Sequence, residues 1–172
     1  MAYTCVNTSA SDGSRLSGIR YMYGFKIPSG HALAGSSPTG FKFNLKTDSS
    51  SGTLSCRLYD SSSSLSSPLH TYATVNLSEL SSTYSTIEFS GSAYTSALTA
   101  GQLIGLEYSS TSGVPDIYIQ VTNASDSEGI FWEYNGTTYE EVTNRSPYYC
   151  YETPVSSGGT RLPPPPIVLG GY

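Results

Sequence analysis

The sequence predicts an all-β protein, an antiparallel β-sandwich or jelly roll of about ten strands with extended N- and C-terminal segments. Three observations support this prediction. Short stretches alternate apolar with polar residues, turn-forming residues separate these stretches roughly every ten positions, and no window of about a dozen residues keeps the apolar stripe of a helix. A parallel sheet would need crossover helices, for which the sequence shows no pattern.

Five stretches alternate clearly and are predicted as strands. In the first of them, Phe41, Phe43 and Leu45 all point to one side of an extended chain, because successive side chains on a strand point to opposite faces. The five stretches, in chain order, are residues 41–46, 54–59, 86–89, 104–108 and 117–122.

Five further stretches alternate less regularly and are predicted as weaker strands. They are residues 20–27, 72–77, 130–134, 138–142 and 148–152. Turn residues separate the strands at 48–52, at the serine run 61–67 before Pro68, and at 109–115. Asn135-Gly136 lies between two of the weaker strands and indicates a tight hairpin.

The predicted domain organisation has three parts. Residues 1–18 contain few apolar groups and are predicted as an extended N-terminal segment, residues 19–154 as one β-sandwich domain, and residues 155–172 as a Gly/Pro-rich C-terminal arm. The four consecutive prolines of the arm favour a stiff polyproline II spacer about 12 Å long, at roughly 3.1 Å per residue.

The apolar tip of the arm follows the prolines, and three interpretations of it remain open. It could form an edge strand of its own domain, dock on a neighbouring subunit by strand addition, or present a ligand to a proline-binding domain. The residues expected to contact another subunit are Pro163, Pro164, Pro165, Pro166, Ile167, Val168, Leu169 and Tyr172.

The composition favours contacts with proteins or sugars. Fifty residues are Ser or Thr and 15 are Tyr, whereas only 12% are charged and the net charge is −5. Nucleic-acid binding needs clustered Lys and Arg, and here the eight basic residues are scattered singly, so neither nucleic acid nor an acidic membrane is an expected partner. No secretory leader pattern and no apolar stretch of transmembrane length occurs in the sequence.

The three cysteines do not suggest a disulfide framework. Cys56 falls on the inward side of a predicted strand and is expected to be a buried thiol. Cys5 and Cys150 are either free or joined to each other if the two ends of the chain meet.

Residues that could perform catalysis are few, so we expect no enzymatic activity and no cofactor. His31 and His70 both fall beside loop residues, lack the spacing of metal ligands and are expected to face solvent. Glu128, Glu133, Glu140 and Glu141 could in principle supply a carboxylate pair, but adjacent residues point to opposite faces and Glu133 is expected on a solvent face. Asp116, Asp126 and Glu128 are weak candidates for a calcium site.

The aromatic residues near Trp132 allow two interpretations. Ile130, Trp132 and Tyr134 share one face of a predicted strand, and Tyr139 follows soon after. If these rings face solvent, Trp132, Tyr134 and Tyr139 could stack on a glycan. If they face inward, Ile130, Trp132 and Tyr134 form part of the core.

Four stretches carry a resemblance to a known family. Residues 40–46, 51–60, 80–89 and 98–108 resemble a family of Ser/Thr-rich jelly-roll β-sandwich modules, most specifically in GTLSCRLYD (52–60) and LTAGQLIGLEYSS (98–110). The resemblance covers roughly residues 19–152. Such modules occur in phage and archaeal-virus virion proteins and in large extracellular proteins, where they look like carbohydrate-binding or decoration domains.

The resemblance implies a scaffold and no specific chemistry, so no site residue is transferred from it. The expected function is that of a non-enzymatic structural virion protein, most concretely a capsid decoration or cement subunit, or else a tail or neck accessory protein. It would form a homo-oligomer and bind other shell proteins through its sandwich surface and terminal arms, assembling in the host cytoplasm and becoming exposed on the particle. The alternative is an extracellular carbohydrate-binding module that recognises a cell-surface glycan.

Overall fold

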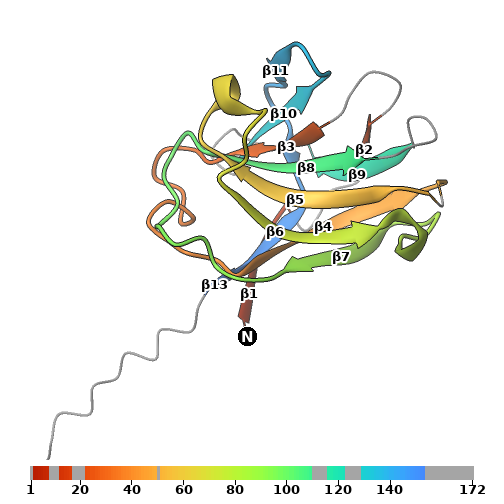
Figure 1. Ribbon diagram of the computed structural model, residues 1–172, viewed down its shortest axis with the longest axis horizontal. Coiled ribbons are helices and arrows are strands. Elements are labelled where there is room, and N and C mark those ends of the chain that lie inside the picture. Colours follow the sequence, from red (N-terminus) through yellow and green to blue (C-terminus); the bar gives the residue numbers. More distant parts are fainter. Residues whose placement is uncertain are drawn as a thin grey trace, which may run out of the picture.

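The computed structural model describes residues 2–7, 12–16, 22–49, 51–109, 116–122 and 129–153, and in these ranges the chain forms two stacked antiparallel β-sheets (Figure 1). The predicted all-β sandwich is therefore confirmed. In the same ranges, helical structure is limited to two short 3-10 turns, η1 (Ser62–Ser64) and η2 (Leu77–Glu79).

Each sheet draws its strands from the whole length of the chain. Sheet A contains β1 (Ala2–Val6), β2 (Asp12–Leu16), β4 (Gly40–Thr47), β7 (Ser85–Ser90), β9 (Ile117–Thr122), β12 (Ser146–Pro147) and β13 (Tyr149–Thr153). Sheet B contains β3 (Met22–Lys26), β5 (Thr53–Tyr59), β6 (His70–Asn76), β8 (Leu103–Ser109), β10 (Ile130–Tyr134) and β11 (Tyr139–Glu141). All five clearly alternating stretches form strands, namely β4, β5, β7, β8 and β9.

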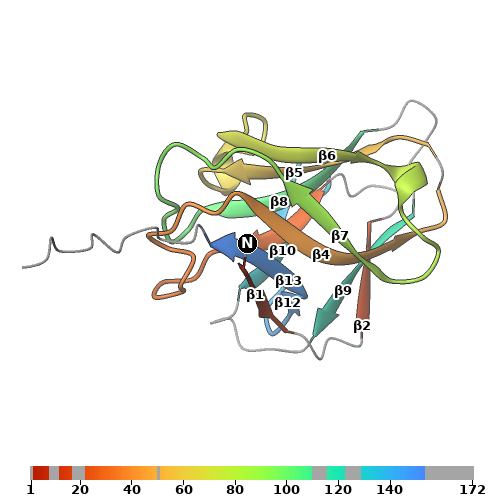
Figure 2. The ribbon, with the colours of Figure 1, turned by 90° about the horizontal axis from the view of Figure 1, so that it is seen from below.

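The strand order is that of a jelly roll. Strands β2 to β9 form the rows β2-β9-β4-β7 in sheet A and β3-β8-β5-β6 in sheet B, and the chain passes repeatedly from one sheet to the other. Strands β10 and β11 extend sheet B beyond β3. The later strand β13 pairs with β4 on one side and with β1 on the other, while β12 pairs with β9 (Figure 2).

The main core lies between the two sheets and is rich in aromatic rings. On β4 the apolar members of the alternation are fully buried, whereas the polar members are partly exposed. Phe25 of β3 stacks on Tyr149 of β13 with 3.9 Å between ring centroids, and Phe41 meets Tyr72 edge to face at 4.9 Å. Each such pair links the two sheets and contributes about 0.5–1.5 kcal/mol beyond its buried area.

The N-terminal region differs from the expectation of an extended segment outside the sandwich. The described parts of residues 1–18, β1 and β2, are strands of sheet A and pair with β13 and β9. In AYTCV only Thr4 is polar, and in DGSRL only Leu16 is apolar, so neither sequence alternates and the apolar pattern could not reveal these strands. Their pairing relies on backbone hydrogen bonds, which any sequence without proline can supply.

A second apolar cluster, the outer cluster, lies on the face of sheet B that points away from sheet A. Its buried members are Met22, Tyr59, Leu65, Leu103 and Trp132. Gly24 and Gly105 pair with each other beneath it, and Trp132 pairs with Gly24 in the next strand. A Cβ added at Gly105 would lie 2.9 Å from the Trp132 ring and 3.2 Å from Tyr59, so the missing side chain makes room for the indole.

Gly105→Ala is expected to lower the free energy of unfolding by about 2–4 kcal/mol, because the new methyl group would force Trp132 and Tyr59 apart in a packed cluster. Urea titration followed by circular dichroism measures the change. Trp132 is the chain's only tryptophan, so its emission should also move to longer wavelength.

Ser109→Ala, at the exposed end of the same strand, is the matched control and should change stability by less than about 0.5 kcal/mol. Equal stability of the Gly105 and Ser109 variants would contradict this description of the outer cluster.

Candidate functional site

The structure places Trp132 differently from both interpretations of its sequence. Its side chain is fully buried, but it belongs to the outer cluster, on the side of sheet B opposite the main core. Phe131, the next residue along β10, fills the main core instead. Tyr139 stacks on Trp132 with 5.7 Å between centroids, and Tyr134 packs against the same cluster. Ligand stacking on the indole would therefore require the cluster to open.

Polar groups surround the outer cluster and pair with one another. Glu107 accepts hydrogen bonds from Arg57 and from the Tyr59 hydroxyl, the latter at 2.9 Å. Glu141 accepts bonds from Lys26 at 2.8 Å and from the hydroxyl of Tyr139 at 2.9 Å. The bond from Lys26 holds the pKa of Glu141 below its ordinary value.

The expected solvent position of Glu133 is wrong. Glu133 lies on the same side of β10 as Phe131 and is only 5% exposed. The error arises because both Phe131 and Trp132 are apolar, so the alternation could not show which side of β10 faces the main core. Glu140 and Glu141 are both exposed on the short strand β11.

The two histidines have structural partners. The imidazole Nδ1 of His31 accepts the backbone N–H of Leu33 at 3.1 Å, and its Nε2 lies 3.1 Å from the Tyr149 hydroxyl. Nε2 of His70 lies 2.8 Å from the carbonyl oxygen of Ser92. Both side chains are partly buried, so the expectation that they simply face solvent is wrong.

The outer face of sheet A carries tyrosines and lysines in contact. The ammonium group of Lys46 lies 4.9 Å from the ring centroid of Tyr84 and 4.8 Å from that of Tyr118. Nearer the N-terminus of β4, Lys42 lies over the Tyr3 ring at 3.7 Å and forms an ion pair of 3.0 Å with Glu88. These contacts are cation–π and ionic interactions on a partly exposed face.

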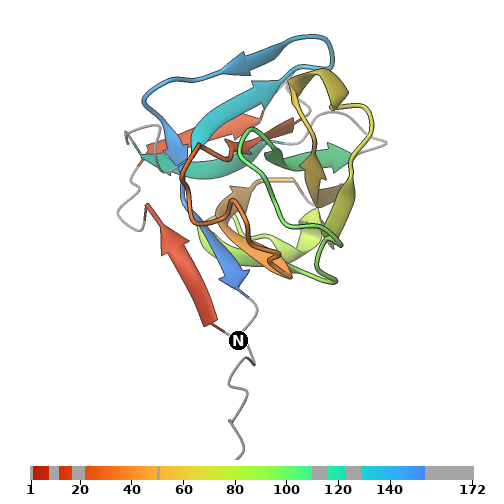
Figure 3. The same cartoon turned by 90° about the vertical axis from the view of Figure 1, so that its left-hand side faces the viewer.

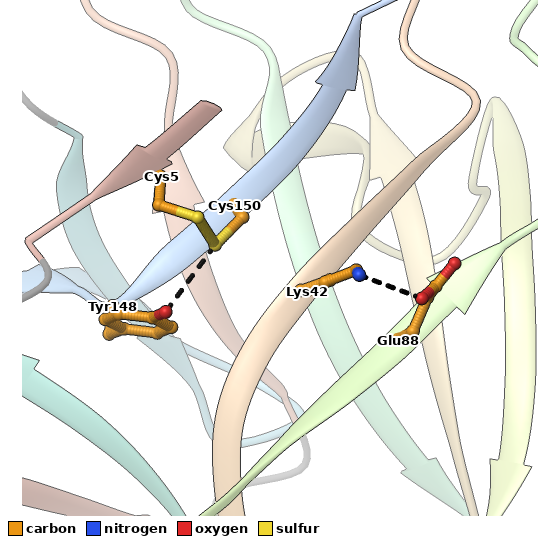
Figure 4. The surroundings of a disulfide bond; sticks show 5 residues. All are labelled: Cys5, Lys42, Glu88, Tyr148 and Cys150. Carbon is orange, nitrogen blue, oxygen red and sulfur yellow. Dashed lines mark hydrogen bonds and ion pairs between the residues drawn. A yellow bond between two sulfur atoms is a disulfide. The ribbon is translucent and has the colours of Figure 1, made fainter. Parts of the chain in front are cut away.

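The side chain of Tyr3 connects β1 to β7 across the outer face of sheet A. Its hydroxyl donates to Glu88 at 2.8 Å, and this bond, together with the one from Lys42, holds the pKa of Glu88 below its ordinary value. Figure 4 shows the Lys42–Glu88 pair close to the disulfide bond that joins the terminal strands.

The disulfide joins Cys5 of β1 to Cys150 of β13, directly opposite in the register and 145 residues apart in sequence (Figure 4). Of the two possibilities left open by the sequence, the joined one is therefore observed. Cys56 is free and fully buried as predicted, and burial raises the pKa of its thiol, which disfavours the thiolate needed for disulfide exchange.

The terminal strands bring the two ends of the described chain together. Ala2 pairs with Thr153, so the last described residue before the C-terminal arm lies beside the start of β1. Asn7 follows β1 in the chain, and its side-chain amide donates hydrogen bonds to the Ser146 hydroxyl and to the Pro147 carbonyl oxygen. The subunit-contact residues expected in the arm, Pro163 to Leu169 and Tyr172, lie outside the described residues.

The suggested calcium site can be assessed only in part. Asp116 precedes β9, and its carbonyl oxygen accepts the hydroxyl of Thr47 at 2.7 Å, whereas Asp126 and Glu128 lie outside the described residues. Within the described ranges, no three His, Cys, Asp or Glu side chains gather as a metal site would require. The described part also contains no helix long and apolar enough to span a membrane.

Comparisons with protein-family models, curated proteins and solved structures give no match to this chain.

Replacing Cys5 by Ser is expected to lower the free energy of unfolding by about 2–5 kcal/mol, because the disulfide restricts a long loop of the unfolded chain. Chemical denaturation of wild type and variant, with and without a phosphine reductant, measures the effect. The reductant should destabilise the wild type by a similar amount and leave the Cys5 variant unchanged. Wild-type stability that does not respond to complete reduction would contradict this role.

The ion pair at Glu141 should make stability depend on pH. Because the folded pKa of Glu141 is below its ordinary value of 4.5, its contribution is present above about pH 4.5 and is lost as the pH falls through the folded pKa. Between pH 6 and pH 3, Glu141→Gln should therefore lose less stability than the wild type, by up to about 1 kcal/mol for a partly exposed pair.

Urea denaturation at the two pH values tests this, with Glu140→Gln on the same strand as the control. The account of Glu141 fails if its variant loses as much stability on acidification as the wild type and the control do.

Proposed function

We propose that the protein is a non-enzymatic structural subunit of a virion surface, most concretely a capsid decoration or cement subunit, with a tail or neck accessory protein as the variant of the same role. It binds copies of itself and neighbouring shell proteins through the faces of its sandwich and through its C-terminal arm. The observation that carries this proposal is the way β13 is anchored.

Strand β13 is paired on both sides. It forms backbone ladders with β4 and with β1, its residues Tyr149 and Tyr151 belong to the main core, and Cys150 is bonded to Cys5. The arm begins directly after this strand. A force applied to the arm would therefore act on a strand held by two ladders, buried rings and a covalent bond, as suits a segment that connects subunits.

The surface chemistry also supports a role in assembly. The Ser/Thr-rich, weakly charged sequence gives a surface with many hydroxyl groups, and two of the described lysines, Lys26 and Lys42, are already paired with carboxylates. Tyr84 and Tyr118 offer large contact areas on sheet A that lose little side-chain entropy on binding.

The alternative function, glycan recognition through Trp132, has less support from the structure. An aromatic platform for sugars needs an accessible ring face, but the indole is fully buried and Tyr139 stacks on it. A carbohydrate-binding role would have to use another surface or an open form of the outer cluster.

Removal of residues 162–172 should abolish self-association and leave the sandwich intact, because the deletion starts beyond the last strand and removes the proposed contact segment. Light scattering measures the mass, and denaturation measures the stability, which should change by less than about 0.5 kcal/mol. A same-length variant in which residues 162–172 are replaced by Gly and Ser controls for chain length and should also remain monomeric.

Three outcomes would count against the proposal. The first is a full chain that is monomeric at every accessible concentration and does not bind to shells of other subunits. The second is a deletion with no effect on assembly. The third is saturable binding of a glycan by a monomer, which would favour the alternative.

A further inference from the structure

Strand β1 forms an open edge of sheet A. Its only ladder among the described strands is with β13, and its other side pairs with no described strand (Figure 3). We call this side the terminal edge. An open edge offers unpaired backbone N–H and C=O groups to an additional strand.

The register identifies the groups that the terminal edge presents. The Cα atoms of Cys5 and Cys150 are 4.0 Å apart, a short separation that is typical of a non-hydrogen-bonded pair in an antiparallel ladder. Pairs alternate along the ladder, so the backbone groups of Cys5 and Tyr3 point away from β13, and those of Thr4 and Val6 point toward it. An added strand would therefore bond to Tyr3 and Cys5.

Three other edge strands of the sandwich contain charged residues. Strand β7 contains Glu88, β2 contains Asp12 and Arg15, and β11 contains Glu140 and Glu141. Charge on an edge strand discourages pairing with another chain. The sequence of β1, AYTCV, contains neither a charged residue nor a proline.

Two edge strands remain: β12, which is two residues long and contains Pro147, and β6, whose His70–Tyr72 end is covered by the chain that follows β7. A Cβ added at Gly91 would lie 2.1 Å from the carbonyl oxygen of Tyr72, and Nε2 of His70 contacts the carbonyl oxygen of Ser92. Among these edge strands, β1 is uncharged, contains no proline and pairs on only one side with a described strand.

The C-terminal arm supplies a segment suited to this edge. Residues 154–166 separate β13 from Ile167, and the four prolines among them have no backbone N–H groups with which to pair. Ile167, Val168 and Leu169 follow immediately and are uncharged, and Ile and Val favour the extended conformation. We propose that these three residues of a neighbouring copy add to the terminal edge as an extra strand.

A neighbouring copy fits this arrangement better than the same copy. The arm begins after Thr153, which pairs with Ala2, and four consecutive prolines favour an extended spacer of about 12 Å over a turn back toward the same copy. In a two-fold pair, each arm can reach the terminal edge of the other subunit, which gives a closed and reciprocal interface. This inference rests on the proposed function, since it names the surface that the arm binds.

The disulfide completes the arrangement, because it fixes the strand that receives the arm. A load on β1 passes through the Cys5–Cys150 bond to β13, which is itself paired with β4. The subunit would therefore receive a neighbour's arm and hold its own arm through the same pair of strands.

Amide hydrogen exchange of the full, oxidised chain, resolved by residue with NMR, tests the inference. In dilute monomer the amides of Tyr3 and Cys5 should exchange rapidly, whereas those of Thr4 and Val6 are protected by the ladder with β13. In the associated state, exchange of Tyr3 and Cys5 should slow by on the order of tenfold or more. Val168→Asp should restore rapid exchange and the monomer mass, whereas the matched variant Val155→Asp, placed before the prolines, should preserve both association and protection.

Failure of the inference is distinguishable from failure of the proposed function. If Val168→Asp dissociates the assembly but Tyr3 and Cys5 exchange rapidly in the wild-type assembly, the arm binds elsewhere and only the inference is wrong. If neither mass nor exchange depends on Val168, both are wrong. Protection of Tyr3 and Cys5 in the dilute monomer would show that a segment of the same copy covers the edge, which overturns docking by a neighbour.

Discussion

Neighbouring residues of β13 point to opposite faces of sheet A, and this alternation connects the core of the protein to its terminal segments. Tyr149 points inward and stacks on Phe25 of sheet B, and Tyr151 joins the same core. Cys150, between them, points outward and bonds to Cys5. A single strand thus couples the packing of the two sheets to the position of β1 and to the start of the arm.

The two sheets use their outer faces differently. On sheet B, Gly105 makes room for Trp132, so part of this face is buried under a cluster of its own. On sheet A, the outer face keeps partly exposed tyrosines and lysines, and β1 lies at its margin (Figure 2). The outer face of sheet A is therefore the more exposed of the two, and the terminal strands β1 and β13 belong to this sheet.

Strands with one solvent-exposed and one buried face could be predicted from the sequence, because such strands need polar and apolar residues in alternation. Strand β4 is an example, with Phe41 and Phe43 buried and Lys42 partly exposed. Strand β10 was predicted, but its orientation was not, since Phe131 and Trp132 fill clusters on opposite faces. Strands β1 and β2 pair through their backbones and carry no apolar pattern. The disulfide forms because β1 and β13 pair in a register that places Cys5 opposite Cys150. The sequence does not show that these strands pair, so it could not decide whether the two cysteines are joined.

The central claim is that β13 anchors an arm by which one copy holds another. A density map of the assembled protein that resolves individual strands tests it most directly. The account predicts an additional strand beside Tyr3 and Cys5 that can be traced through four prolines to the β13 of an adjacent copy. A map in which each arm lies on its own sandwich, or in which subunits meet without any contact from the arms, would contradict it.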